Sequence, residues 1–391
     1  MDKKFVMGIA AMAALTLVSC SSDDLDSFSD NSSKNEAISF DGYLGRSAVA
    51  VNGSRGSEET VNTLKTKGFG VFGKYTPTEG QASNLFDNQI VTYSTSTTPT
   101  ESKWTYSPLK FWPANGKIDF FAYAPYDKNT TLTENSKINF KVAEKVADQK
   151  DLLWTNDMNH QITAKITSEK DKVKFQFHHA LSRLGYNVTL SGDYFSSGAT
   201  FTVNKITLAG SSDGTSKKAF YKEGTIDLAK IVTKDNTGNN KNKEDLSKTN
   251  TGTGLWTAET SDKNKQNFDL VSSNQTLGKD GIKSGNNYLF VIPQDFSQTK
   301  TEGGSDVDEL YVYVEYTINY GGTTGSVTNK VYKQIKKHFL QGNAYMLNLT
   351  LGLPIEFDVD VTGSIDAGVD GWGTDEGINI GSNDENPWDR K

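Results

Sequence analysis

The stretch Phe111–Tyr126, which reads F-W-P-A-N-G-K-I-D-F-F-A-Y-A-P-Y, constrains the fold of this chain more than any other. From Ile118 onward, apolar residues occupy every second position, and two further aromatic residues fall on the opposite face of an extended strand. Asn115-Gly116 offers a turn before this strand, and Pro125 cannot donate the hydrogen bond that would extend it. We therefore predict a buried central strand of a β-sandwich, in a hairpin with Trp104–Trp112.

The composition also favours β-structure. The chain has 391 residues, enough for about two domains, and its supply of Thr, Tyr, Phe, Gly and Asn suits strands and turns better than helices. Turn signals at short intervals, without a long amphipathic helical pattern, predict an all-β fold. The net charge of −7 at pH 7 argues against a nucleic-acid partner, because such partners usually require a basic face.

The N-terminus has the features of a lipoprotein signal. Two lysines precede an apolar run that is too short to span a bilayer comfortably, and Leu17-Val18-Ser19-Cys20 matches a lipobox. We predict a signal peptide over residues 1–19 and attachment of lipid to the thiol of Cys20. Because Cys20 is the only cysteine, neither an intrachain disulfide nor a thiolate metal cluster is expected. Residues 20–36 are acidic and polar, which predicts a disordered tether.

Apolar and polar residues alternate in one strand near the start of the mature chain and in another near its end. The apolar faces consist of Ile38, Phe40 and Leu44 in the first strand and of Ile355, Phe357, Val359 and Val361 in the last. Asp358–Gly363 also matches the start of a calcium loop, but Val369 stands where the loop requires glutamate, so strand alternation is favoured. Beyond this strand, Trp372 is an apolar anchor in a polar tail.

Three short motifs suggest chemistry that their surroundings do not support. Gly68–Gly73 spells the dinucleotide fingerprint G-x-G-x-x-G, but no helical pattern follows, so we predict a strand whose glycines face aromatic neighbours. Gly210–Gly214 spells G-x-S-x-G, where a turn is favoured over a nucleophile elbow for the same reason. His178 and His179 would point to opposite faces of a strand, which favours a core or interdomain role over metal binding. We expect no enzyme activity, no cofactor and no metal.

The central stretch, W-P-x-x-G followed by I-D-F-F-A-Y-A-P, resembles the fimbrillin-like lipoproteins of Bacteroidia, which supply subunits and anchors of type V pili. The lipobox, F-Q-F-H-H-A-L-S-R-L at Phe175–Leu184 and N-A-Y-M-L-N-L-T-L at Asn343–Leu351 fit the same family. The resemblance implies two transthyretin-like β-sandwich domains in tandem, over residues 37–170 and 171–391, and a non-enzymatic role in assembly.

The predicted boundary between the two domains lies in the charged run Glu169–Lys172. Just after it, Arg183 is expected to pair with a carboxylate or with backbone carbonyls at the domain junction. The second domain would carry a polar, solvated loop over residues 234–254 and the donor-strand-like tail. The segment 47–67, between the first strand and the first domain's next strand, is small and polar and predicts a flexible link.

The resemblance also implies a route of assembly. In this family a protease that cuts after arginine removes the first strand, and a strand from a neighbouring subunit fills the groove. The chain has only four arginines, and Arg46 and Arg55 both follow the first strand closely, so either is a candidate cut site. The donor would come from Ile355, Phe357, Val359, Val361 or the tail around Trp372.

Ser21-Ser22-Asp23-Asp24 follows the lipidated cysteine and resembles the acidic export signal of Bacteroidia lipoproteins. It implies a surface-exposed protein, lipid-anchored in the outer membrane and found in the fimbrium after processing. The implied partners are other fimbrillin-like subunits, an arginine-specific protease, the outer membrane and a host or bacterial surface ligand.

Two alternatives share these features. A surface glycan-binding lipoprotein of a polysaccharide-capture system would also have the lipobox, the tether and the β-sandwich domains, with Trp256, Trp372 and Trp388 as aromatic residues in polar surroundings. An uncleaved fimbrial anchor would differ only in keeping its first strand. The sequence leaves open whether the chain is a stalk, tip or anchor subunit.

Overall fold

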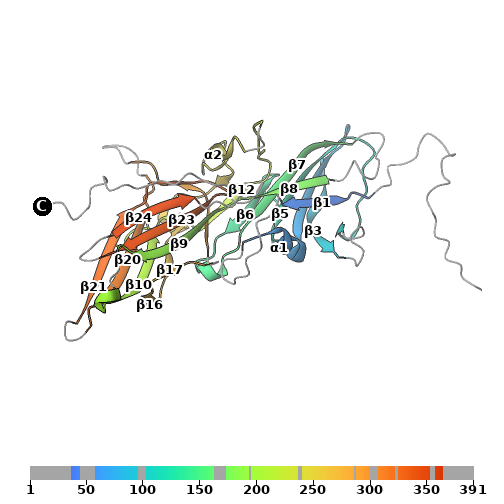
Figure 1. Ribbon diagram of the computed structural model, residues 1–391. Coiled ribbons are helices and arrows are strands. Elements are labelled where there is room, and N and C mark those ends of the chain that lie inside the picture. Colours follow the sequence, from blue (N-terminus) through green and yellow to red (C-terminus); the bar gives the residue numbers. More distant parts are fainter. Residues whose placement is uncertain are drawn as a thin grey trace, which may run out of the picture.

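The computed structural model is an elongated, almost entirely β structure with two lobes (Figure 1), which confirms the predicted fold class. It describes residues 37–44, 58–95, 103–162, 173–192, 195–236, 240–285, 288–299, 307–321, 325–352 and 357–363. The first lobe, coloured from blue to green, contains the N-terminal strands, and the second, coloured from green to red, contains most of the later ones.

A seven-stranded sheet forms the first lobe, in the order β1-β8-β7-β5-β2-β3-β4. Its strands are β1 (Phe40–Leu44), β2 (Phe69–Thr76), β3 (Ser83–Ser94), β4 (Lys103–Thr105), β5 (Lys117–Ala124), β7 (Leu153–Gln161) and β8 (Val173–His179). β1 pairs with β8 in parallel, whereas the other neighbours are antiparallel. The helix α1 (Val61–Lys67) precedes β2.

β5 lies at the centre of this sheet and is buried on both faces, as the sequence predicted. Phe120 is fully buried on one face, and Phe121 and Tyr123 are 2% exposed on the other. The predicted hairpin with Trp104–Trp112 is wrong, because β7 and β2 occupy both edges of β5. β4 pairs instead with β3, where the ring of Trp104 packs 4.9 Å from that of Phe69.

The sheet of the first lobe curls around a single core. Its two end strands, β1 and β4, lie in contact, so that β1 closes the curl. The core includes large side chains from every strand of the sheet, namely Phe40, Phe69, Phe86, Trp104, Trp112, Phe120, Leu153, Phe175 and Phe177. The first lobe therefore depends on a short edge strand to keep this core away from water.

Gly68–Gly73 forms the entry to β2 and most of that strand, which confirms the strand interpretation of the motif. A Cβ atom at Gly73 would approach the ring of Phe86 to 2.7 Å, and one at Gly70 would overlap the ring of Tyr123. These glycines allow close contact with aromatic side chains, so they need no nucleotide to explain them.

A three-stranded sheet joins the two halves of the chain. β6 (Lys137–Lys141) pairs with β12 (Glu223–Asp227), which also pairs with β13 (Trp256–Thr257). The second hydrophobic core starts on the outer face of the first sheet, at Phe121 and Tyr123, and continues through this small sheet into the second lobe. The two lobes thus share this second core, whereas the first core lies within the first lobe.

Two five-stranded sheets face each other in the second lobe. One contains β10 (Thr200–Ala209), β15 (Phe268–Val271), β16 (Gln275–Leu277), β20 (Tyr311–Asn319) and β21 (Ser326–Gln334). The other contains β9 (Ser182–Leu190), β17 (Ile282–Lys283), β18 (Leu289–Val291), β23 (Ala344–Leu351) and β24 (Phe357–Gly363). Alternate residues of β20 and β23 are buried, as expected for strands with one face on a shared core.

Short elements complete the fold. They are the strand pairs β11 (Phe220–Tyr221) with β14 (Lys265–Gln266) and β19 (Gln294–Asp295) with β22 (His338–Phe339), the helix α2 (Lys243–Leu246), and the 3-10 helices at Val146–Asp148, Phe195–Ser197 and Asp262–Asn264. α2 lies within the predicted polar loop 234–254. Its Leu246 and the following Ser247 are 2% and 1% exposed, so this part of the loop is anchored to the body of the protein.

The predicted boundary near Glu169–Lys172 assigned Val173–His179 to the second domain. In the structure this segment is β8, which pairs with β1 and β7 in the first sheet. The alternation of Val173, Phe175 and Phe177 predicted the strand correctly, but alternation cannot identify the sheet that the strand joins. The last strand of the first lobe therefore follows the predicted boundary.

Replacing Phe120 with alanine should lower the free energy of unfolding by about 3–5 kcal/mol, because it leaves a cavity at the centre of the first core. Phe111→Ala is the matched control, since the Phe111 side chain is 51% exposed and its loss should cost about 1 kcal/mol or less. Urea denaturation of both variants measures the difference. Equal losses would contradict the position of β5 at the centre of the core.

Candidate functional site: the first strand and its groove

β1 is an edge strand held by one ladder. Phe40 to Leu44 pair residue by residue with Val173 to Phe177 of β8, in parallel. Within the described residues, no second strand pairs along the other edge of β1. An edge strand can leave a sheet by breaking one ladder of hydrogen bonds, whereas an interior strand such as β5 must break two.

The residues just before β1 are fixed by the chain that follows β4. Ala37 forms an isolated antiparallel bridge with Phe111, and the amide of Ile38 donates to the carbonyl of Lys110 at 2.8 Å. The hydroxyl of Tyr106 donates to the carbonyl of Ile38 at 2.6 Å. Burial raises the pKa of Tyr106, which keeps this hydroxyl protonated and able to donate.

Phe40 is the main apolar contact of β1, and its side chain is 4% exposed. Four aromatic rings surround it, with centroids 5.3 Å away for Phe86, 5.4 Å for Tyr106, 5.6 Å for Phe175 and 5.8 Å for Phe120. The ring of Phe175 is nearly parallel to that of Phe40, at 10°, and that of Phe120 is nearly perpendicular, at 85°. Both arrangements are favourable for aromatic pairs.

Ile38 precedes Phe40 by two residues and points to the same side of the chain. It is 1% exposed and belongs to the same core cluster. We call the space that Ile38 and Phe40 fill, together with the edge of β8, the β1 groove. Burying an isoleucine and a phenylalanine contributes several kcal/mol, so an empty β1 groove would expose a large apolar area.

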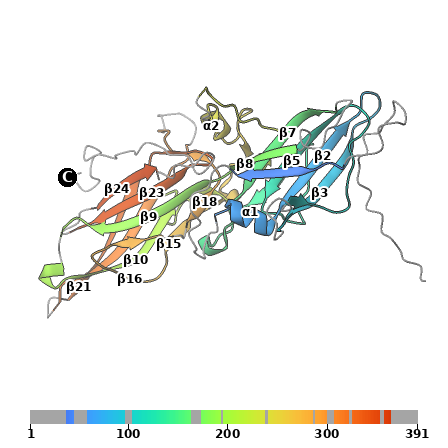
Figure 2. The same cartoon turned by 45° about the vertical axis from the view of Figure 1, so that its right-hand side comes forward.

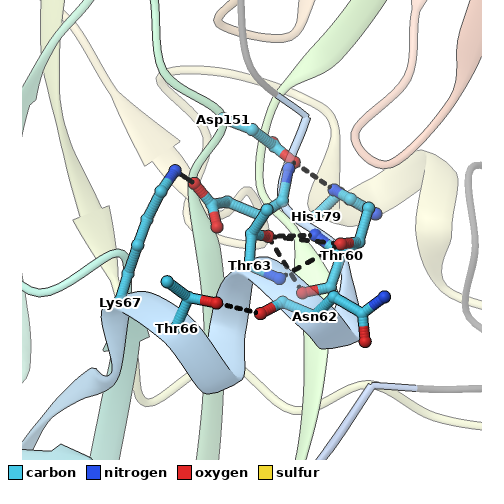
Figure 3. Close-up of polar contacts among 8 residues, drawn as sticks. Thr60, Asn62, Thr63, Thr66, Lys67, Asp151 and His179 are labelled. Atoms are coloured by element: carbon cyan, nitrogen blue, oxygen red, sulfur yellow. Dashed lines mark hydrogen bonds and ion pairs between the residues drawn. The ribbon is translucent and has the colours of Figure 1, made fainter. Parts of the chain in front are cut away.

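The next described residues after β1 begin at Glu58 and lead into α1. The hydroxyl of Thr60 accepts from the amide of Thr63 at 3.2 Å, and the amide of Thr60 donates to the hydroxyl of Thr63 at 2.6 Å, which forms a reciprocal capping box at the N-terminus of α1 (Figure 3). We did not predict α1 in the polar segment 47–67. The pattern Thr60-x-x-Thr63, followed by the buried Leu64, was the available signal.

Glu59 carries a buried charge immediately before this cap. Its carboxylate lies 2.5 Å from the ammonium of Lys67, at the other end of α1, and its backbone amide donates to Asp151 at 3.2 Å. Asp151 is fully buried and is also hydrogen-bonded to Nδ1 of His179 on β8 at 2.7 Å (Figure 3). Desolvation raises the pKa of Glu59, and the nearby Lys67 opposes that rise.

Glu58 and Arg183 add a second ion pair, in which Arg183 is buried and Glu58 is partly exposed. Arg183 is 3% exposed, its guanidinium donates to the carboxylate of Glu58 at 2.6 Å, and it lies 4.2 Å from the centre of the Tyr288 ring. The predicted pairing of Arg183 with a carboxylate is confirmed. The burial of His179 agrees with the predicted core position, and its partner is Asp151.

We call Glu58, Glu59 and α1, with Asp151 just before β7, His179 on β8 and Arg183 on β9, the α1 anchor. In each pair one member, Glu59 or Arg183, is buried, and removing the counter-ion of a buried charge is expensive. The α1 anchor therefore fixes the chain from residue 58 onward without any contribution from β1. Sequence patterns did not reveal Glu58, Glu59 or Asp151, because their partners are distant in the chain.

The predicted site residues fall into two groups. Ile38 and Phe40 fill the β1 groove, the backbone of Leu44 ends β1, and the backbone of Phe357, Val359 and Val361 lies in β24 of the other lobe. The rest of the predicted set lies outside the described residues and consists of Cys20, Arg46, Arg55, Ile355 and Trp372. Trp256, proposed as an exposed sugar platform, is fully buried and donates from Nε1 to the carbonyl of Ala180 at 2.8 Å.

The remaining motifs have structural explanations. Gly210–Gly214 forms a turn in which Asp213 accepts from the amides of Thr215 and Ser216, both at 2.8 Å. In the part of the chain that the structure describes, no three His, Cys, Asp or Glu residues are placed to hold a metal ion. Over the same residues, no helix is long and apolar enough to cross a membrane.

Comparison with known proteins adds the family. The sequence model of the fimbrillin-like family matches residues 57–372. The fimbrium subunit Fim1C of Phocaeicola vulgatus is 26% identical over 397 residues, covering 95% of this chain and 97% of that protein. The crystal structure of a fimbrial protein from Bacteroides vulgatus is similar in fold, with a TM-score of 0.51, 19% identity, and coverage of 84% of this chain and 99% of that one. The chain belongs to the fimbrillin-like family.

Proposed function

We propose that this protein is a lipid-anchored surface subunit of a fimbrium, which polymerises by β-strand exchange after proteolysis frees its first strand. One observation carries the proposal. Phe40 of β1 and the preceding Ile38 are buried in the core of the first lobe, yet β1 is an edge strand. Residues 45–57 connect it to Glu58, the next described residue. That link contains Arg46 and Arg55.

A cut in this link would separate β1 from the rest of the protein. The α1 anchor holds residue 58 and the chain after it through Glu58, Glu59 and their partners, so the body of the first lobe keeps its fold. The departure of β1 would empty the β1 groove and leave the edge of β8 without its partner. Such an edge binds a strand of matching pattern, because backbone hydrogen bonds supply affinity and alternate side chains supply register.

The best candidate donor is β24, with the tail around Trp372 as its continuation. β24 is itself an edge strand, paired only with β23 among the described residues. It lies in the second lobe, whereas β1 lies in the first (Figures 1 and 2). A donor in one lobe and a groove in the other suit head-to-tail polymerisation, in which each subunit fills the groove of the next.

The uncleaved anchor and the glycan-binding lipoprotein each require features that distinguish them from a polymerising subunit. An uncleaved anchor would retain β1 and its lipid, so the state of the link between β1 and α1 distinguishes it from a polymerising subunit. A glycan-binding role needs exposed aromatic residues, and the burial of Trp256 removes one of the three that suggested it. We therefore favour the fimbrial subunit, with the outer membrane, other subunits and an arginine-specific protease as its partners.

Cleavage after Arg46 or Arg55 should trigger assembly. An arginine-specific protease should convert the wild-type protein to a form that begins at Ser47 or Gly56, and this form should then give a ladder of detergent-resistant oligomers on a gel. The Arg46→Ala/Arg55→Ala double variant should stay monomeric, because β1 remains attached. Arg390→Ala is the control, since it removes an arginine far from the link. If the double variant polymerises as well as the wild type, removal of β1 is not the trigger.

Cys20 should carry the membrane anchor. Cells grown with an alkyne-tagged fatty acid should label the wild-type precursor, and Cys20→Ala should show no label and should not fractionate with the outer membrane. The physical reason is that acyl chains on this thiol contribute roughly 0.8 kcal/mol for each buried CH₂ group. Cys20→Ser is the matched control, because serine keeps a small polar side chain but lacks the thiol, so it should also show no label. Equal labelling of the wild type and both variants would show that the lipid is attached elsewhere.

A further inference from the structure

The β1 groove sets a specific pattern for any strand that replaces β1. It accepts an aliphatic side chain at the position of Ile38 and an aromatic one two residues later, among the four rings that surround Phe40. The next residue, Asp41, lies opposite Lys174 in the parallel register, and Lys174 is exposed. Opposite charges at directly paired positions favour one register over its neighbours.

The sequence of the groove's own strand recurs near the C-terminus. Ile38-Ser39-Phe40-Asp41 has the pattern I-x-F-D, and Ile355-Glu356-Phe357-Asp358 repeats it. The pattern occurs at these two places in the chain and nowhere else. In the same alignment Val361 stands at the position of Leu44, so a third apolar position also matches.

The two strands with this pattern have equivalent places in the fold. β1 and β24 are both edge strands, each paired with one neighbour in the described part of its sheet. β24 pairs with β23 so that Phe357 lies opposite Leu351 and Asp358 opposite Thr350. It can therefore leave by breaking a single ladder, and the residue opposite Asp358 in β23 is an uncharged threonine.

We propose that the pattern fixes the register of strand exchange, with Phe357 of one subunit taking the place of Phe40 in the next. This inference rests on the proposed function and adds the exact pairing. β24 of the donor runs parallel to β8 of the acceptor, Phe357 lies opposite Val173, Asp358 opposite Lys174, and Val361 opposite Phe177. Phe86, Tyr106, Phe120 and Phe175 surround the ring of Phe357.

One sequence difference between the strands also favours replacement of β1 by the donor strand over the reverse exchange. The donor has Val359 where the original strand has Gly42. A β-branched residue suits an extended strand, whereas glycine loses more backbone freedom when it is ordered. The incoming strand thus matches the groove at Ile38, Phe40 and Asp41 and is the better strand former between those positions and Leu44.

Cysteine pairs test this register directly. The full chain with Lys174→Cys and Asp358→Cys is cut with the arginine-specific protease, allowed to assemble and oxidised; cutting also removes Cys20. Directly opposed residues in neighbouring strands have Cα atoms close enough for a disulfide, so this pair should give covalent oligomers on a non-reducing gel. The pair Lys174→Cys with Asp360→Cys is the matched control, and it should crosslink only if the strand is shifted by two residues.

The outcomes separate the register from the proposed function. Polymers that crosslink through Asp360→Cys, or through neither pair, would overturn the register and leave strand exchange standing. Failure of the cut wild-type protein to form polymers would overturn both.

A second experiment, with a synthetic peptide, tests the proposal even if a cysteine variant does not assemble. A synthetic peptide of residues 353–364 should bind the cut wild-type protein, and its Phe357→Ala form should bind about a hundredfold more weakly, because the ring fills the aromatic pocket. The same peptide with Val359→Ala should lose far less affinity. Equal binding by the Phe357→Ala and unmodified peptides would overturn the proposal.

Discussion

Burial of β5 on both faces is the constraint on which the rest of the structure depends. One face contributes Ile118 and Phe120 to the core of the first lobe, and the other contributes Phe121 and Tyr123 to the core that extends into the second lobe. A strand buried in this way needs a paired neighbour on each side, and β2 and β7 supply them. The interior of the first sheet is therefore fixed, and only its edges can change.

This constraint makes β1 the replaceable part of the first lobe. Its backbone is held by one ladder, but Ile38 and Phe40 together represent roughly 5–10 kcal/mol of burial by the usual cost of their truncation. That amount is comparable with the whole stability of a typical domain, roughly 5–15 kcal/mol. We therefore expect a first lobe that has lost β1 to gain much stability when another strand fills the β1 groove. Until then, the contacts of the α1 anchor are the ones that hold the chain from residue 58 onward.

Local patterns predicted the features that depend on local sequence. Alternation identified β1, β5, β8 and β24 as strands, and the lack of a helical pattern after Gly73 correctly favoured a strand at Gly68–Gly73. The same patterns could not identify strand partners: β4 joined β3, and β8 joined the first sheet. The α1 anchor was missed because Glu59 and Asp151 are 92 residues apart, so their hydrogen bond has no local signature. Trp256 has polar neighbours in sequence, yet tertiary packing places it in the core.

The most direct test of the account follows amide hydrogen exchange in β8 before cleavage, after cleavage and in the assembled polymer. In the intact protein the backbone of β8 from Val173 to Phe177 is paired with β1, and the amide of Val173 donates to Ser39 at 2.9 Å. We expect slow exchange in the intact protein, fast exchange in the cut monomer and slow exchange again in the polymer, while amides of β5 stay protected throughout. Protection of β8 that does not change on cleavage would contradict the claim that β1 is a removable strand.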